Sequence, residues 1–268
     1  MAGVDRNIFS TFRRARRVWA VAAIHGEAGR LKALHKLLGD RLCDGDRLVY
    51  LGNYMGHGIA ISETIDELLL FRRQFLSAPG TFSCDIAYLR GQQEEMWQKL
   101  LQLQLAVSPS EVLTWMLNQG LETTLAAYGS DPETALRRAR SGALELARWT
   151  NELRQRMQEQ GGHVDLMSSL RRAAFTDDGS LLFVHAGIDG NRPLDAQGDA
   201  FWWHSGNFTN MDSSYSGYRK VVRGFEPDHG GVQVGLHSAT IDSGCGFGGP
   251  LTCVCFDTDG EEAERLEA

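Results

Sequence analysis

Short β-prone apolar runs alternate with helical stretches between residues 18 and 89, and this alternation most limits what the chain can fold into. The runs cover residues 18–24, 48–51 and 86–89. The intervening stretches carry apolar residues at helical spacing, at Leu31, Leu34, Leu38, Ile65, Leu68 and Leu69. Strands that alternate with helices form layered α/β domains, whose working loops leave the carboxyl ends of the strands. The sequence therefore predicts an α/β fold.

The rest of the chain adds a helical insertion and a second strand-rich half. Residues 94–160 read as almost entirely helical, and strands resume at 181–184. No internal repeat or low-complexity linker divides the chain. We therefore predict a single domain over residues 1–268, with a basic lead-in at 1–17 and a helical cap at 94–175.

Composition excludes several classes of protein. Hydrophobic residues at 43% and charged residues at 23% are ordinary globular values, which argues against disorder. The net charge of −7 disfavours duplex nucleic acid as a partner, because such binding depends on cations that neutralise phosphates. No apolar run reaches the roughly 18 residues of a membrane-spanning helix, so no transmembrane segment is expected. Five cysteines without framework spacing indicate a reduced, cytoplasmic protein.

Four arginines precede the first apolar run, at Arg13, Arg14, Arg16 and Arg17. Together with residues 18–24 they loosely resemble a secretory or twin-arginine leader. The apolar stretch is at the short limit for a leader, and it runs straight into His25. We interpret the segment as a buried strand behind a solvated basic lead-in. A basic arm for an anionic partner is the alternative.

Two histidines occupy the same kind of position in different halves of the chain. His25 follows the first apolar run and His185 follows another, and each is followed closely by a glycine. A single histidine at a strand end is more often a packed residue than a ligand. Two of them in the same arrangement favour a shared site built from loops.

Four strings lie in order along the chain: Ala-Ile-His-Gly at 23–26, Gly-Asn-Tyr-Met-Gly-His-Gly at 52–58, Gly-Gln-Gln-Glu at 91–94, and a longer string at 183–197. With these strings the chain resembles calcineurin-like metallophosphoesterases, in the branch of bacterial serine/threonine protein phosphatases and symmetrical bis(5′-nucleosyl)-tetraphosphatases. The first three fall on the family motifs Asp-x-His-Gly, Gly-Asp-x-x-Asp-Arg-Gly and Gly-Asn-His-Glu. The resemblance covers nearly the whole chain. It implies a sandwich of two mixed β-sheets flanked by helices, with an inserted helical cap.

The resemblance also implies two divalent metals that share a bridging carboxylate and activate a water for attack on phosphorus. The family's ligands would fall at Ala23, His25, Asn53, Gln92, His185 and Phe225. Only the two histidines keep the family's residue type. Alanine and phenylalanine offer no ligand atom, and the amides of asparagine and glutamine carry no charge. Both anionic ligands are absent, so nothing offsets the charge of two dications.

The family's acid and phosphate-binding positions have changed as well. The leaving-group acid falls on Gln93, and the aspartate that orients it falls on Gly56. One phosphate-binding arginine falls on His57 and a second on Ser205. An amide donates no proton at a useful pKa, and neither serine nor neutral imidazole binds phosphate bidentately. Glu94 needs no functional role, since a carboxylate at the start of a helix meets its dipole favourably.

These losses favour a pseudophosphatase, a catalytically inactive phosphoesterase domain that serves in binding or regulation. No cofactor is expected at its vestigial site, and its partner would be a protein or a phosphate-containing small ligand. Such a ligand would be held without cleavage by side chains of His25, His57, His185, Gln92 and Gln93. The same side chains would also fill a collapsed site by hydrogen bonding to one another.

The alternative is an active, metal-dependent phosphatase with a rearranged site, acting on phosphoproteins or dinucleoside polyphosphates. His25, His57 and His185, with a water, form an acceptable mononuclear zinc set. In that case one zinc or manganese ion would bind at His25 and His185.

Overall fold

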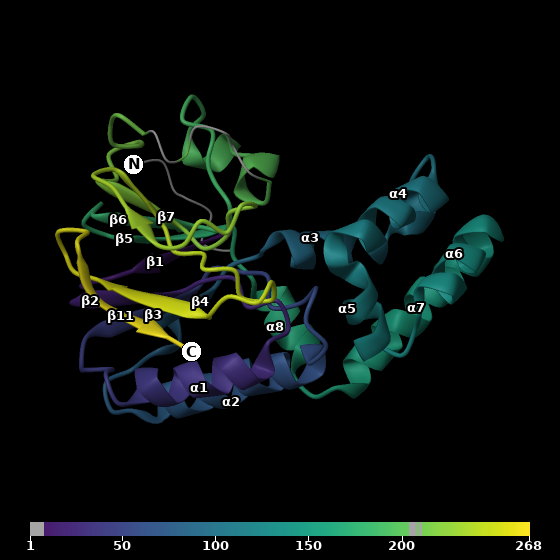
Figure 1. Ribbon diagram of the computed structural model, residues 1–268, viewed down its shortest axis with the longest axis horizontal. Helices are drawn as coiled ribbons and strands as arrows, with labels where there is room; N and C mark the ends of the chain where they lie inside the picture. The colour runs from purple at the N-terminus through teal and green to yellow at the C-terminus, as the bar shows by residue number, and fades with distance from the viewer. Residues whose placement is uncertain (1–7, 204–207, 209–210) are drawn as a thin grey trace.

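Two β-sheets pack face to face, as predicted, and helices cover the outside of the sandwich (Figure 1). The computed structural model describes residues 8–203, 208 and 211–268, so Ser205 lies outside the described residues. The six-stranded sheet has the order β1 (Phe9–Phe12), β5 (Ala173–Thr176), β6 (Leu181–Val184), β7 (Lys220–Arg223), β9 (Ser238–Thr240), β8 (Gln233–Val234). The five-stranded sheet has the order β11 (Glu262–Glu267), β10 (Thr252–Phe256), β2 (Arg17–Val21), β3 (Asp46–Tyr50), β4 (Ile86–Tyr88). Both sheets contain parallel and antiparallel pairs.

The strands of the first half are buried on both faces. In β2, Val18 and Ala20 face the layer between the sheets, whereas Trp19 and Val21 pack beneath the helices. Successive side chains of a strand point to opposite faces, so a strand between two apolar layers reads as a continuous apolar run. This arrangement explains why the run at 18–24 shows no polar alternation.

Helices α1 (Ala28–Gly39) and α2 (Ile61–Ser77) cover the outer face of the five-stranded sheet (Figure 1). Leu31, Leu34 and Leu38 are fully buried, as their helical spacing predicted. The two helices connect β2, β3 and β4 in parallel, which brings the carboxyl ends of these strands to one edge of the sheet. None of the described helices is long and apolar enough to cross a membrane.

The helical insertion consists of α3 (Gln92–Leu100), α4 (Pro109–Met116), α5 (Glu122–Ala127), α6 (Pro132–Arg140), α7 (Ala143–Glu159) and α8 (His163–Ser169). A π turn joins α4 to α5, and shorter 3₁₀ turns lie at Ser83–Asp85, Leu103–Leu105, Leu194–Ala196 and Asp199–Phe201. In Figure 1, α4, α6 and α7 project away from the sandwich. The predicted range of 94–175 is too long at its end, because residues 173–176 pair with β1 and β6 as strand β5.

Part of the predicted basic lead-in is a strand. Phe9 and Phe12 are buried, and β1 pairs in parallel with β5 at the edge of the six-stranded sheet. The prediction of a solvated lead-in over 1–17 is therefore wrong for residues 9–12. Arg17 already belongs to β2, and its guanidinium pairs with the buried carboxylate of Asp46 at 2.6 Å.

Phe183 tests the layer between the sheets. Its buried ring meets Phe12 and Phe256 edge to face, with ring centroids 6.5 and 6.4 Å away. We expect Phe183→Ala to lower the free energy of unfolding by about 3–5 kcal/mol, because it empties a close-packed layer. Urea unfolding measures this change. Phe82→Ala is the control, since Phe82 is 66% exposed, and it should shift the free energy by less than about 0.5 kcal/mol. An equal loss of free energy of unfolding in the two variants would contradict the assignment of Phe183 to the packed layer between the sheets.

Candidate functional site

Loops that follow four strands meet at one end of the sandwich, near the start of α3. His185 directly follows β6, and His25, Asn53 and Phe225 lie in the loops after β2, β3 and β7. Backbone hydrogen bonds join these loops: His25 N–H donates to the carbonyl of Asn53 at 2.6 Å, and Phe225 N–H to that of His185 at 3.0 Å. The structure therefore brings together residues that lie far apart in the sequence.

The loops are held in an uncommon backbone conformation. His25, Asn53 and His57 have φ values of 53°, 52° and 56°, in the left-handed region that glycine usually occupies. Such a conformation costs roughly 1–3 kcal/mol per residue and persists where the surroundings fix it. Here the chain is tightly packed, since a Cβ on Gly58 would lie 2.3 Å from the carbonyl oxygen of His25. The loop scaffold is thus rigidly defined.

Aromatic rings fill the space between the loops. We call this group the His–Phe cluster, and it consists of His25, His57, His185, His229, Phe225 and Phe247. Phe225 stacks on His185, with ring centroids 5.3 Å apart and planes inclined by 7°. Phe247 lies 5.2 Å from His25, 4.4 Å from His57 and 4.1 Å from His229, centroid to centroid. Phe247 is 47% exposed, so the cluster has an aromatic face open to solvent.

Phe225 is accommodated by small neighbours. Its ring forms a separate buried apolar cluster with Ala23 and Ala186. An alanine at 23 leaves room for a phenyl ring, whereas a larger side chain there would meet it, because protein interiors are close-packed. Ala23 and Phe225, at two positions where the resemblance implies metal ligands, therefore belong to one buried apolar cluster.

Asn53 and Gln93 are bound to the surrounding polypeptide. The Oδ1 of Asn53 accepts from the backbone N–H of Gln93 at 3.0 Å, and its Nδ2 lies 3.3 Å from Nε2 of His25. The Nε2 of Gln93 donates to the carbonyl of Gln119 at 2.7 Å. Gly56 gives the Gln93 side chain its room, since a Cβ there would lie 2.3 Å from Cδ of Gln93. These amides act as structural links between the loop after β3, the start of α3 and the π turn that joins α4 to α5.

His57 and Gln92 complete the set of predicted residues. The His57 backbone N–H donates to the carbonyl of Gly120 at 3.3 Å, and its ring lies over that glycine, where a Cβ would be 2.7 Å from Nε2. His57 therefore packs against the insertion. Gln92 is buried in the first turn of α3, next to Gln93.

Burial keeps most of the imidazoles of the cluster neutral. Burial lowers the pKa of His185 to about 4, although hydrogen bonding to the Leu51 carbonyl opposes the shift. The pKa of His25 falls well below its usual value, first through burial and then through the neighbouring histidines. Burial also lowers the pKa of His57. His229 differs, because its hydrogen bond to Asp242 at 2.8 Å raises its pKa.

Three buried polar atoms of the site have no hydrogen-bond partner in the structure: Nε2 of His185, Nδ1 of His25 and Oε1 of Gln93. The Nδ1 of His185 donates to the carbonyl of Leu51 at 2.6 Å, which leaves a lone pair on Nε2. His185 thus keeps the orientation typical of a metal-ligating histidine.

The remaining donors do not complete a metal site. Among the described residues, no group of three or more histidine, cysteine, aspartate or glutamate side chains is arranged to hold a metal ion. Ala23 and Phe225 contribute only carbon, and the amide of Asn53 is already hydrogen-bonded. The residues present therefore do not fit the two-metal centre that the resemblance implies.

Sequence reasoning missed two members of the cluster. His229 follows Phe225 by four residues, but an isolated histidine in a loop carries no signal of its own. Phe247 lies in a glycine-rich turn between Gly246 and Gly248, both with positive φ. A bulky aromatic residue in such a turn is the one feature that could have indicated it.

Comparisons with known proteins bear on the fold. No protein-family model matches the sequence, and no curated protein matches it. A solved structure described as a diadenosine tetraphosphatase aligns over 98% of both chains, with a TM-score of 0.57 and 16% identity. A cold-active protein tyrosine phosphatase aligns over 96% of this chain and 80% of its own, with a TM-score of 0.51 and 14% identity. A serine/threonine phosphatase from Saccharomyces cerevisiae aligns over 97% and 82%, with a TM-score of 0.51 and 13% identity.

At these identities the likeness concerns the fold alone. Two mixed sheets flanked by helices, aligned along nearly the full length with known phosphatases, confirm the fold that the sequence strings indicated. The chain has the calcineurin-like metallophosphoesterase fold.

The buried His185 predicts how stability depends on pH. Its pKa is about 4 in the folded chain and about 6.5 when unfolded, so between these values the unfolded state binds more protons. Stability contributed by neutral His185 is therefore present above pH 6.5 and lost as the pH falls towards 4. In His185→Asn the amide can still donate to the Leu51 carbonyl, but it does not titrate. As the pH falls through this range, we expect the free energy of unfolding of this variant to decrease by up to about 1.4 kcal/mol per pH unit less than that of the wild type.

Urea unfolding at several pH values between 4 and 7 measures the two slopes. Carboxylates that titrate in the same range are shared by both proteins, so they cancel in the difference. A His185→Asn slope equal to the wild-type slope would show that His185 is not held neutral.

Proposed function

We propose that this chain is a pseudophosphatase, a phosphoesterase-fold protein that binds a partner or ligand without hydrolysing a phosphate ester. The observation that carries this proposal is the contact of Phe225 with Ala23 and Ala186 at the centre of the site. Apolar side chains, those of Ala23 and Phe225, occupy two positions where hydrolysis by the family's mechanism needs charged or imidazole ligands. An apolar contact cannot be converted into a ligand set by a change of rotamer.

The polar side chains support the same proposal. The Asn53 amide, at the position of the bridging carboxylate, carries no charge and is already engaged by Gln93 and His25. The Gln93 amide, at the position of the acid, donates to a backbone carbonyl. The His57 imidazole, at the position of a phosphate-binding arginine, packs against the insertion and is uncharged at neutral pH. The site therefore lacks the charged ligands that bind the metals, the acid that protonates the leaving group and the cation that binds the phosphate.

The open side of the His–Phe cluster gives the proposal its binding role. Phe247 is half-exposed above His25 and His57, and these rings offer apolar faces with neutral nitrogens between them. A protein side chain or a phosphate-containing small ligand would meet stacking surfaces and hydrogen-bonding groups here, with no charged nucleophile.

One observation favours an active enzyme with a mononuclear site. Nε2 of His185 and Nδ1 of His25 are buried without partners, as free ligand atoms would be. A catalytic zinc needs a third protein ligand, and His57 is the candidate. The described residues contain no preformed group of three, so we rank this function second.

We expect the purified protein to show no hydrolysis of p-nitrophenyl phosphate, a phosphopeptide or diadenosine tetraphosphate with manganese, zinc, magnesium or iron. The missing acid alone forfeits roughly 10²- to 10⁴-fold in rate, and without a metal-bound water no nucleophile forms at neutral pH. Release of phosphate or nucleotide, measured at each metal, tests this expectation. Metal-dependent turnover that His25→Ala abolishes would overturn the pseudophosphatase and establish the rearranged site.

Reversion towards the family pattern is the complementary experiment. Single reversions should restore no activity, because the missing groups act as a unit. Gly56→Asp alone should also destabilise the fold, since Gly56 has positive φ and its Cβ would meet Gln93. The full set combines Ala23→Asp, Asn53→Asp, Gly56→Asp, His57→Arg, Gln92→Asn, Gln93→His and Phe225→His. Activity in any single reversion would contradict the account of a jointly depleted site.

A further inference from the structure

A cavity of about 430 Å³ lies among three helices of the insertion, α3, α7 and α8. Its volume is within the range of small-molecule sites, about 300–1,000 Å³. We call it the helix cavity and define it by Trp97, Leu101, Arg154, Met157, Met167 and Leu170. None of its described lining residues belongs to the His–Phe cluster.

The wall of the helix cavity is mostly apolar. Trp97, Met157 and Leu170 are buried, and Leu101 and Met167 pack partly buried against the same hydrophobic core. The ring of Trp97 is held against that of Tyr128, with centroids 5.1 Å apart. Methionine side chains are flexible and adapt to the shape of what they contact. A wall of this kind suits the apolar body of a small molecule.

Arg154 adds one positive charge to this apolar wall. Its guanidinium donates to the carbonyl of Leu101 and, at 2.7 Å, to Oδ1 of Asn151, and both of these acceptors are uncharged. No carboxylate of a described residue forms an ion pair with Arg154. Since a guanidinium has five N–H groups, three remain for a further acceptor. A carboxylate is the acceptor that fits this group best, because the hydrogen bonds are then charge-assisted.

The other charged residues of the helix cavity already have partners. Arg90 forms an ion pair with Glu95 at 3.2 Å, and the buried carboxylate of Glu94 accepts hydrogen bonds from backbone N–H groups of the loop after β3. Leu101, whose carbonyl binds Arg154, lies about two turns or about 10 Å beyond Glu94 along α3. An anionic group beside Arg154 is therefore kept away from the negative charge of Glu94.

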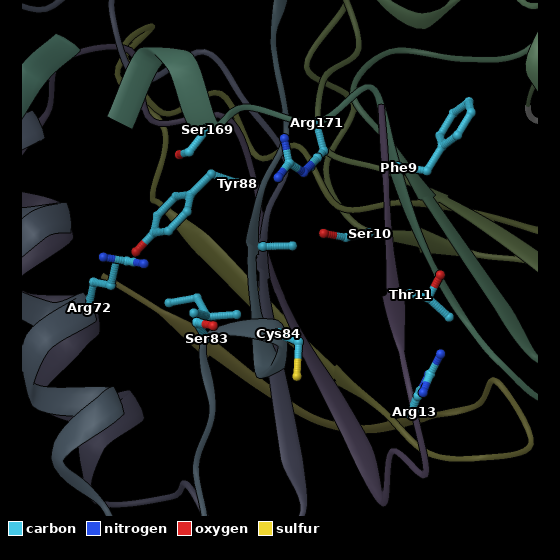
Figure 2. Close-up of a pocket in the computed structure, with 12 residues that line it drawn as sticks. Phe9, Ser10, Thr11, Arg13, Arg72, Ser83, Cys84, Tyr88, Ser169 and Arg171 are labelled. Carbon is cyan, nitrogen blue, oxygen red and sulfur yellow. The ribbon is translucent and has the colours of Figure 1, made fainter. Parts of the chain in front are cut away.

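The cavity between the edge strands β1 and β4 offers a different wall, which Figure 2 shows. Serine, threonine and arginine side chains line it, and the hydroxyl of Tyr88 already donates to the carbonyl of Leu68 at 3.4 Å. The helix cavity, in contrast, joins an apolar wall to a cation that no described carboxylate meets.

We propose that the helix cavity binds a small carboxylate with an apolar body. The carboxylate pairs with Arg154, and the body packs against Trp97 and Met157. This binding site is independent of the proposed function, since it shares no described residue with the His–Phe cluster. No chemical step is involved.

Octanoate is the probe for this site, and 1-octanol is its neutral counterpart with the same number of carbon atoms. Equilibrium dialysis of each labelled compound against the purified protein measures its Kd and stoichiometry. We expect octanoate to bind saturably at about one equivalent per chain. The Kd of 1-octanol should be about tenfold higher, because it lacks the charge-assisted contact with Arg154.

Two arginines of α7 give a matched pair of variants. Arg154→Gln should raise the Kd of octanoate about tenfold and leave that of 1-octanol unaltered, because only the carboxylate loses a contact. A merely structural role of Arg154 would weaken both compounds. Arg148→Gln makes the same charge change outside the cavity, at a side chain that is 63% exposed and pairs with Glu145, and should change neither Kd.

Gln158→Glu keeps the proposal testable if Arg154→Gln does not fold. Gln158 is exposed and lines the helix cavity one turn beyond Arg154 on α7. A carboxylate there competes with octanoate for the guanidinium, since side chains four residues apart on a helix are neighbours. The Kd of octanoate should rise and that of 1-octanol should stay the same. Circular dichroism confirms that each variant is folded before dialysis.

Three results would overturn the proposal. The first is the absence of saturable octanoate binding. The second is an equal rise in the Kd of octanoate in Arg154→Gln and Arg148→Gln, which would indicate a general effect of charge. The third is equally tight binding of octanoate and 1-octanol, which would show that the carboxylate is not recognised.

Discussion

The buried carboxylate of Glu94 holds the loop after β3 in place, and the geometry of the whole site depends on it. Its two oxygens accept from the backbone N–H groups of Asn53, Tyr54, Met55 and Gly91 at 2.8–3.2 Å. Burial raises the pKa of Glu94, and these four hydrogen bonds oppose that shift by favouring the charged form. The left-handed conformation of Asn53 is therefore fixed by hydrogen bonds from within the chain. A loop anchored in this way keeps its shape without a metal ion.

On this scaffold the centre of the site is apolar. Phe225 packs in one buried cluster with Ala23 and Ala186, and the small side chains leave room for the phenyl ring. The Leu51 carbonyl orients His185, and the His185 ring stacks on Phe225. The result is a phosphoesterase fold with a mostly neutral, aromatic site.

Features that repeat along the chain could be predicted from the sequence. The spacing of Leu31, Leu34 and Leu38 gave the buried side of α1, and the order of the four strings indicated which loops meet. Strand β1 was missed because four residues flanked by arginines carry too little periodicity, and only pairing with β5 makes them a strand. Phe247 was missed because its contacts depend on how a distant turn folds back over His25. For Glu94 the helix dipole explained its position but not the four N–H groups it binds.

The most direct test of the central claim is the metal content of the purified protein, by elemental analysis after reconstitution with manganese and zinc and removal of free metal. Because Phe225 and Ala23 form an apolar contact in place of ligands, we expect far less than one equivalent of metal per chain, and His185→Ala should not change this value. One or more equivalents of tightly held metal that His185→Ala removes would contradict the account.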